Sequence, residues 1–268
     1  MTERYSHGHH GSVLRSHGTR TAANSAAHLL PHLRPGMAVL DVGCGPGTIT
    51  LDLAAAVGPT GRVVGVDASE AAVAAARAEA GRRGDDRTSF AGADAYALPA
   101  ADATYDVVHA HQLLQHLGDP VAALREMARV TKPGGIVAAR DADYSAMTWH
   151  PASEGMTRWL STYRALARAN GGEPDAGRRL RGWARAAGLT EVTASASAWS
   201  YGTAEETAWW AGVWADRATQ SAFATQAVEL GLATDADLAE IAAAWRAWGE
   251  HPEAWFGMLH GEILARVD

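Results

Sequence analysis

The hydrophobic pattern of the first half of the chain predicts strands that alternate with helices. Five short apolar runs are compatible with burial on both faces, as parallel strands require. A helical pattern follows the first run directly, and further helices are expected at residues 71–80 and 121–130. This order predicts an α/β fold whose parallel sheet is covered by helices on both faces. The five predicted strands are residues 37–42, 62–66, 88–91, 105–110 and 136–140.

The second half of the chain carries helical patterns that a plain sheet of this kind does not need. Residues 203–230 and 235–248 are predicted helices, and each begins with a Thr followed three positions later by an acidic residue. This spacing is typical of a capping box, which satisfies backbone N–H groups at a helix start. Another helix is expected near residues 156–170. Insertions at about 146–175 and 203–252 therefore predict a helical cap.

All ten tryptophans of the chain lie between Trp149 and its C-terminal end. Trp210 and Trp214 are four positions apart, and Trp245 and Trp248 are three apart, so each pair shares one helix face. Such faces are more often core than ligand wall. We therefore expect most of these rings to pack, with one or two lining a pocket, and Trp149 after the fifth strand is the preferred candidate.

The strongest chemical signal is the glycine-rich run VLDVGCGPGTITLDLA at residues 39–54. Gly43, Gly45 and Gly47 form a turn between the first strand and a helix, where backbone without a Cβ can approach a ligand closely. A dinucleotide site uses the spacing G-x-G-x-x-G. Here Thr48 stands where the last glycine of that pattern would be. The spacing therefore disfavours a nicotinamide-dependent oxidoreductase, which remains an alternative.

This D-x-G-x-G-x-G pattern, led by Asp41, resembles the first motif of class I S-adenosylmethionine (SAM)-dependent methyltransferases. The segment at residues 92–135 resembles the ubiquinone/menaquinone-biosynthesis type of these enzymes, a broad family with many small-molecule members. The resemblance extends over residues 37–144. It implies methyl transfer from SAM to a small organic acceptor on oxygen, nitrogen or carbon. Non-methyl chemistry on SAM, or SAM binding without catalysis, remain alternatives.

The resemblance also implies a fold: a seven-stranded, Rossmann-like, doubly wound sheet, mostly parallel, with the last strand antiparallel between the fifth and sixth. Residues 189–200 are the expected sixth strand and residues 255–267 the seventh. One structural domain with a helical cap is expected. Its parts are an N-terminal lid segment and helix (1–34), the SAM-binding core (35–145), and the remaining sheet with the cap (146–268).

The cofactor contacts are predicted from the same resemblance. Asp67 ends the second strand twenty positions after Gly47, where an acidic residue binds ribose in this architecture. The methionine end is assigned to Asp41, Gly43 and Gly45, and the ribose to Asp67 and Ala68. The adenine is assigned to Asp94 and Ala95, and the surroundings of the sulfonium to His111 and Gln112.

Acceptor contacts are expected from the lid and from the segment after the fifth strand. In related methyltransferases the segment before the first strand folds over the SAM carboxylate and the acceptor, so Tyr5 and His7 are candidates, and Arg20 suits a carboxylate. Tyr144 and Trp149 are candidates on the other side. The His-x-His-His run that starts at His7 lacks an acidic or thiolate partner at ligand spacing, so no metal is expected.

Two residues are predicted to take part in catalysis. His116 lies on an LLQHL segment where the family often has a histidine, and a structural hydrogen bond is its alternative role. Asp141 and Asp143 follow the fifth strand at the end where ligands bind in open α/β sheets. Of the two, Asp143 is preferred. A general base is needed only if the acceptor is an alcohol or phenol.

Composition narrows the class of protein. The formal net charge of −7 disfavours a nucleic-acid surface, and no run of the sequence is long and apolar enough for a membrane span. The single cysteine, Cys44, cannot form an intrachain disulfide, which favours a cytoplasmic enzyme. The expected partner is a small-molecule acceptor, and the oligomeric state does not follow from the sequence.

Overall fold

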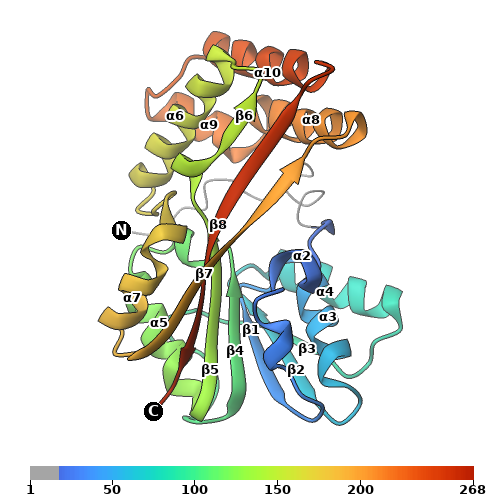
Figure 1. The fold of residues 1–268 in the computed structure, drawn as a ribbon, viewed down its shortest axis with the longest axis vertical. Helices are drawn as coiled ribbons and strands as arrows, with labels where there is room; N and C mark the ends of the chain where they lie inside the picture. Colours follow the sequence, from blue (N-terminus) through green and yellow to red (C-terminus); the bar gives the residue numbers. More distant parts are fainter. Residues whose placement is uncertain (1–17) are drawn as a thin grey trace.

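The computed structural model describes residues 18–268, which form a single eight-stranded sheet with flanking helices (Figure 1). Five of its strands come from the glycine-rich half of the chain, as the hydrophobic pattern predicts. The strands are β1 (Ala38–Val42), β2 (Arg62–Asp67), β3 (Ser89–Gly92), β4 (Tyr105–His111), β5 (Thr131–Ala142), β6 (Thr148–His150), β7 (Glu191–Tyr201) and β8 (Trp255–Arg266).

The topology is that of a doubly wound sheet with an antiparallel insertion. The strand order is β3-β2-β1-β4-β5-β8, and β7 pairs with the other edge of β8. Strands β1 to β5 run parallel to one another, whereas β8 is antiparallel to both β5 and β7. The last strand therefore lies between the fifth strand and the predicted sixth, which confirms that expectation. The sequence did not predict β6, a three-residue strand that pairs with the start of β8.

The helices follow the predicted pattern with two differences. The region predicted as one helix, 203–230, is interrupted at Ser221, whose backbone is extended and whose hydroxyl accepts from the Phe223 N–H at 3.2 Å. The helix at Leu180–Ala186 was not predicted. The α-helices are α2 (Ala22–Ser25), α3 (Thr48–Val57), α4 (Glu70–Arg83), α5 (Pro120–Val130), α6 (Glu154–Ala169), α7 (Leu180–Ala186), α8 (Ala204–Gln220), α9 (Ala222–Glu229) and α10 (Asp235–Gly249); short 3-10 helices are η1 (Leu30–His32), η2 (Leu114–His116), η3 (Tyr144–Ala146) and η4 (Ala176–Arg179).

Helix starts in the cap are fixed by local side chains. Thr203 and Thr234 each accept from a backbone N–H three residues later, and the acidic residue there accepts from the threonine N–H in return. Both predicted capping boxes are therefore confirmed. Figure 1 shows α6, α8, α9 and α10 gathered at one end of the molecule, where β6 and the long strands β7 and β8 extend beyond strands β1 to β4.

Tryptophan rings form the centre of this cap. Trp159, Trp214 and Trp245 are fully buried, with ring centroids 4.4 Å apart for Trp159–Trp214 and 4.8 Å for Trp159–Trp245. Phe256 of β8 contacts the same cluster. The Trp210–Trp214 and Trp245–Trp248 pairs both lie within it, so the interpretation of these pairs as core is confirmed.

The cap is joined to the sheet by the paired strands β7 and β8. Strands β7 and β8 pair over eleven positions and belong to both the cap core and the sheet core. Within the described residues, no helix is long and apolar enough to cross a membrane.

Candidate functional site

The glycine-rich turn after β1 uses each of its glycines for a different reason. All three have positive φ angles, of +73° at Gly43, +53° at Gly45 and +78° at Gly47. A Cβ on Gly47 would lie 2.9 Å from Phe90, so this glycine allows α3 to approach the sheet. A Cβ on Gly43 would collide with Leu113, also at 2.9 Å. Among the described residues, nothing lies within 4 Å of a Cβ on Gly45, so the turn is open there.

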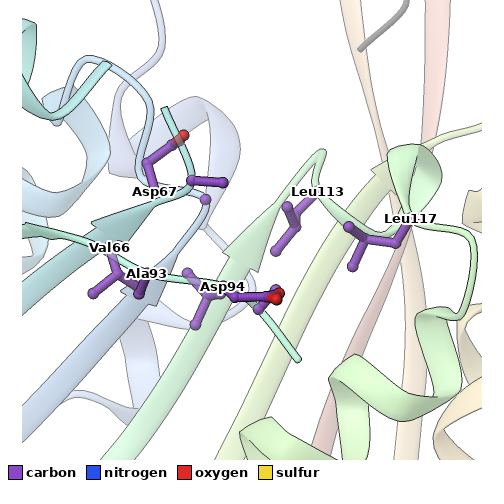
Figure 2. Close-up of a pocket in the computed structure, with 10 residues that line it drawn as sticks. Val66, Asp67, Ala93, Asp94, Leu113 and Leu117 are labelled. Atoms are coloured by element: carbon purple, nitrogen blue, oxygen red, sulfur yellow. The ribbon is translucent and has the colours of Figure 1, made fainter. Parts of the chain in front are cut away.

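A cleft that opens to solvent lies at the carboxyl ends of β1, β2 and β3, beside this turn. Figure 2 shows Asp67 and Asp94 on its β2–β3 side, with Leu113 and Leu117 opposite. The lining residues are Val42, Gly43, Val66, Asp67, Ala68, Ala93, Asp94, Ala95, Leu113 and Leu117.

Both carboxylates of the cleft are held by backbone donors. Asp67 accepts from the Gly45 N–H at 3.0 Å and from the Ser69 N–H at 2.9 Å. Asp94 accepts from the Tyr96 N–H at 2.9 Å. An ionised carboxylate can accept about four hydrogen bonds, so Asp67 keeps capacity for two more. The structure therefore brings together Gly43, Asp67, Ala68, Asp94 and Ala95 in one cleft, which Gly45 adjoins.

Asp41 lies below the turn and does not line this cleft. Its side chain is buried, and its oxygens accept from Thr50 Oγ1 at 2.6 Å and pair with His109 Nδ1 at 2.8 Å. The first acidic residue of the motif is therefore engaged by β4 and α3. This arrangement fixes the end of β1 from which the turn departs.

Gln112 and His111 stand at the end of β4. Gln112 has a φ of +50°, and its side chain accepts from Arg20 at 2.6 Å and contacts His260 Nε2 at 2.8 Å. His260 Nδ1 lies 3.1 Å from the Met258 carbonyl, so that nitrogen carries the proton and Nε2 accepts from the Gln112 amide. Within residues 18–268, neither nitrogen of His111 has a hydrogen-bond partner.

The two predicted catalytic residues lie in different surroundings. His116 lies on η2, and burial together with the Arg20 charge lowers its pKa to about 3. Such an imidazole is a poor proton acceptor at neutral pH. Asp143 is buried, and both its oxygens accept from Arg178, from Nε at 2.5 Å and from Nη2 at 2.7 Å. This carboxylate is occupied by a bidentate ion pair, and a catalytic role for Asp143 stays a prediction.

Asp141 occupies the more unusual environment of the two acidic residues. It is fully buried, one oxygen accepts from the Gln115 N–H at 3.2 Å, and the other has no partner in the described part of the chain. Burial raises its pKa to about 7. The residue faces the η2 side of β5, opposite to the face of Arg140.

The predicted acceptor residues are not brought together. Tyr144 is buried and stacks on Tyr163 with centroids 4.2 Å apart, and Trp149 packs against Phe256 at 6.2 Å. Both pack in the cap, Tyr144 within its core and Trp149 partly buried against it, and their contact with an acceptor stays a prediction. Tyr5 and His7 lie outside the described residues.

Trp199 is the ring that sequence reasoning missed. It lies 5.6 Å from the His111 ring and 4.5 Å from the His260 ring, and the Arg140 guanidinium is 5.0 Å from its centroid. Two patterns in the sequence could have pointed to this place. Arg140 is a charged residue at the end of an apolar strand, and an alternation of small polar residues along β7 leads to Trp199.

Within residues 18–268 there is no group of three potential metal ligands.

The comparisons with known proteins agree with this architecture. Residues 33–188 match the model of a family described as a methyltransferase domain, so the chain belongs to that family. An uncharacterized methyltransferase of Schizosaccharomyces pombe is 34% identical over 98% of this chain and 96% of its own. A demethylmenaquinone methyltransferase of Lactococcus lactis is 38% identical over 38% of this chain and 40% of its own.

The crystal structure of the [4+2]-cyclase SpnF superposes with a TM-score of 0.54 at 25% identity, covering 90% of this chain and 80% of that one. Family membership and fold together assign the chain to the class I SAM-dependent methyltransferases that act on small molecules. They give no support to a nicotinamide-dependent oxidoreductase.

Proposed function

We propose that the chain binds SAM in the cleft beside β1, β2 and β3 and transfers its methyl group to a small organic acceptor. The observation that carries this proposal is the pairing of Asp67 with the open turn at Gly45. The Asp67 carboxylate is fixed by two backbone donors and retains lone pairs toward the cleft. A ribose offers two adjacent hydroxyls, which match that remaining capacity.

The other predicted contacts divide into binding and positioning roles. Asp94 and Ala95 line the part of the cleft proposed for adenine, and Gly43 lies next to Leu113 where the methionine end would pass. Asp41 has no place in the cleft, because Thr50 and His109 take up its oxygens. We assign Asp41 the positioning of the turn.

SAM, when bound, supplies a methyl group on a positively charged sulfur; transfer breaks the sulfur–methyl bond, forms the acceptor–methyl bond and leaves S-adenosylhomocysteine. The chain orients the acceptor and excludes water, which is where most of the rate enhancement of such a displacement arises. His111 is the titratable group nearest the end of β4. Burial and the nearby Arg20 and Arg140 charges hold its pKa well below the ordinary value. It is therefore neutral and weakly basic, and the proposed reaction does not depend on it for proton removal.

The proposal is tested by titrating the full chain with SAM and with NADH in a calorimeter. Asp67→Ala removes two charge-assisted hydrogen bonds to ribose, so SAM affinity should fall by about tenfold or more. The exposed Asp86 provides the control, because Asp86→Ala should leave the affinity unchanged. Unchanged SAM binding by a folded Asp67→Ala variant would refute the proposed site, and NADH binding by the native chain would refute SAM as the cofactor.

The single Cys44 favours a reducing compartment, and we propose that the protein acts in the cytoplasm.

A further inference from the structure

A row of polar side chains crosses the buried sheet where the cap begins. His111 of β4 is in register with Arg140 of β5. Arg140 is opposite Glu262 of β8, which in turn faces Ser195 of β7. Residues in register point to the same face of a sheet, and Figure 1 shows these four strands side by side. His111, Arg140 and Glu262 are each at most 5% exposed.

The hydrogen bonds of this row leave Arg140 only partly satisfied. Arg140 Nε lies 3.2 Å from Glu262 Oε1 and 3.0 Å from Ser197 Oγ. Glu262 also accepts from the Ser195 hydroxyl at 2.8 Å. Both terminal nitrogens of Arg140, Nη1 and Nη2, are buried and have no hydrogen-bond partner in the described part of the chain. Unpaired buried donors of this kind are rare and call for a specific explanation.

The charges around these nitrogens favour an anion. Arg140 and Arg20 both lie beside the Trp199 ring, at 5.0 and 5.7 Å from its centroid. Glu262 is the carboxylate of the row, and its oxygens are already shared with serine hydroxyls and Arg140. His111 adds no positive charge, because burial lowers its pKa well below its ordinary value. Two guanidinium groups therefore lie beside one ring, and only Arg140 is paired with the carboxylate of Glu262.

Aromatic rings lie beside Arg140. The rings of Trp199, His111 and His260 lie 4.5 to 6.2 Å from one another, so they pack on each other and form one aromatic surface. Trp199 is held over the sheet by a hydrogen bond from its indole N–H to the Asn24 carbonyl at 2.6 Å. The outer face or edge of such a surface suits a flat, conjugated molecule.

We propose that Arg140 binds the carboxylate of a planar, conjugated or aromatic acid, and that this acid is the methyl acceptor. The proposal rests on the proposed function. The two parallel N–H donors of Nη1 and Nη2 match the two oxygens of a carboxylate, a geometry that a lysine cannot reproduce. Arg140 anchors the acid, and Trp199 and His111 bound its ring system. Because the bound carboxylate fixes the position of the acceptor atom that receives the methyl group, the reaction depends less on a general base with a shifted pKa.

The position of Arg140 separates it from the cofactor. The cleft proposed for SAM is lined from β1, β2 and β3 and by the segment after β4, whereas Arg140 is on β5 and its partner on β8. Gln112, which follows β4, accepts from Arg20 at 2.6 Å. We expect Arg20 to receive the methionine carboxylate of SAM. The competing assignment, Arg140 as a second contact to that carboxylate, is an outcome of the test below.

The test uses the full chain saturated with S-adenosylhomocysteine, which carries the methionine carboxylate and so occupies the cofactor site. Benzoate, cinnamate and 4-hydroxybenzoate are titrated calorimetrically, each beside its uncharged amide. At least one acid should bind about tenfold more tightly than its amide, since charged hydrogen bonds contribute more than neutral ones. Arg140→Gln and Arg140→Lys should both abolish that preference and leave S-adenosylhomocysteine affinity unchanged. The exposed Arg82→Gln is the matched control.

Three results would overturn the proposal. If none of the acids binds better than its amide, the chain has no anion site for them at Arg140. An Arg140→Lys variant that keeps the full preference would reduce Arg140 to a structural partner of Glu262. Loss of S-adenosylhomocysteine affinity in the Arg140 variants, with acid binding retained, would move Arg140 to the cofactor site. If Arg140→Gln fails to fold, the Arg140→Gln/Glu262→Gln pair removes the unpaired charge and is used in its place. Failure of the native chain to bind S-adenosylhomocysteine would instead refute the proposed function.

Discussion

The buried carboxyl of Asp141 makes the stability of this protein depend on pH in a direction that can be predicted. Burial raises its pKa from 3.8 to about 7, against the opposing charges of Arg140 and Arg20. The folded state therefore holds a proton between pH 4 and 7 that the unfolded chain has released. Where the folded state binds more protons, the free energy of unfolding falls as pH rises. Asp141 thus destabilises the fold progressively through this window, and its full cost is present above pH 7.

The size of the change in the free energy of unfolding follows from the width of this pH window. One pKa unit corresponds to about 1.4 kcal/mol, so the contribution of Asp141 should change by on the order of 3 kcal/mol between pH 5 and pH 7. Asp141→Asn cannot ionise and should not show this change. Its amide still accepts from the Gln115 N–H but buries an unpaired NH2 group at a cost of about 1–3 kcal/mol at every pH. The variant should therefore be less stable than the native chain at pH 5 and more stable at pH 8.

Urea unfolding of both proteins at several pH values between 5 and 8 measures this difference directly. Subtracting one profile from the other removes the other titrating groups, which are common to both chains. Asp86→Asn, at an exposed position, should give a profile parallel to that of the native chain. Parallel profiles for Asp141→Asn and the native chain would show that Asp141 is ionised in the folded state at pH 5, contrary to the argument.

Two further predictions concern the turn and the cap junction. Gly47→Ala should lower the free energy of unfolding by about 2–3 kcal/mol, because its Cβ would meet Phe90 at 2.9 Å and the φ angle is +78°. Gly45→Ala should cost less stability, since its φ is also positive but its Cβ meets nothing within 4 Å among the described residues, and it should in addition weaken SAM binding. Thermal melts and SAM titrations of the two variants separate these effects. Arg178→Met should cost about 1–3 kcal/mol by leaving the buried Asp143 carboxylate without its bidentate partner, and adding Asp143→Asn should recover part of the loss in urea unfolding; full additivity of the two changes would contradict the ion pair.

Local features of this protein were determined by residues close together in the sequence. The turn after β1, the helix that follows it and the acidic end of β2 could all be predicted, because glycine placement and hydrophobic periodicity act over a few residues. The capping boxes at Thr203 and Thr234 belong to the same class, since each involves side chains three positions apart. The antiparallel last strand was predicted from the resemblance to the methyltransferases and is where that resemblance placed it.

The tertiary structure decided which polar residues meet. Asp143 was preferred over Asp141 from the local sequence alone, but its partner Arg178 lies 35 residues further on and could not be read from the local pattern. Arg140 and Glu262 are 122 positions apart and are adjacent only because β8 inserts antiparallel beside β5 in one particular register. A shift of one residue would turn every side chain of β8 to the opposite face. Hydrophobic periodicity predicts that such a strand exists. Packing of the whole sheet and cap fixes its register and thereby brings together the row of polar side chains around Arg140.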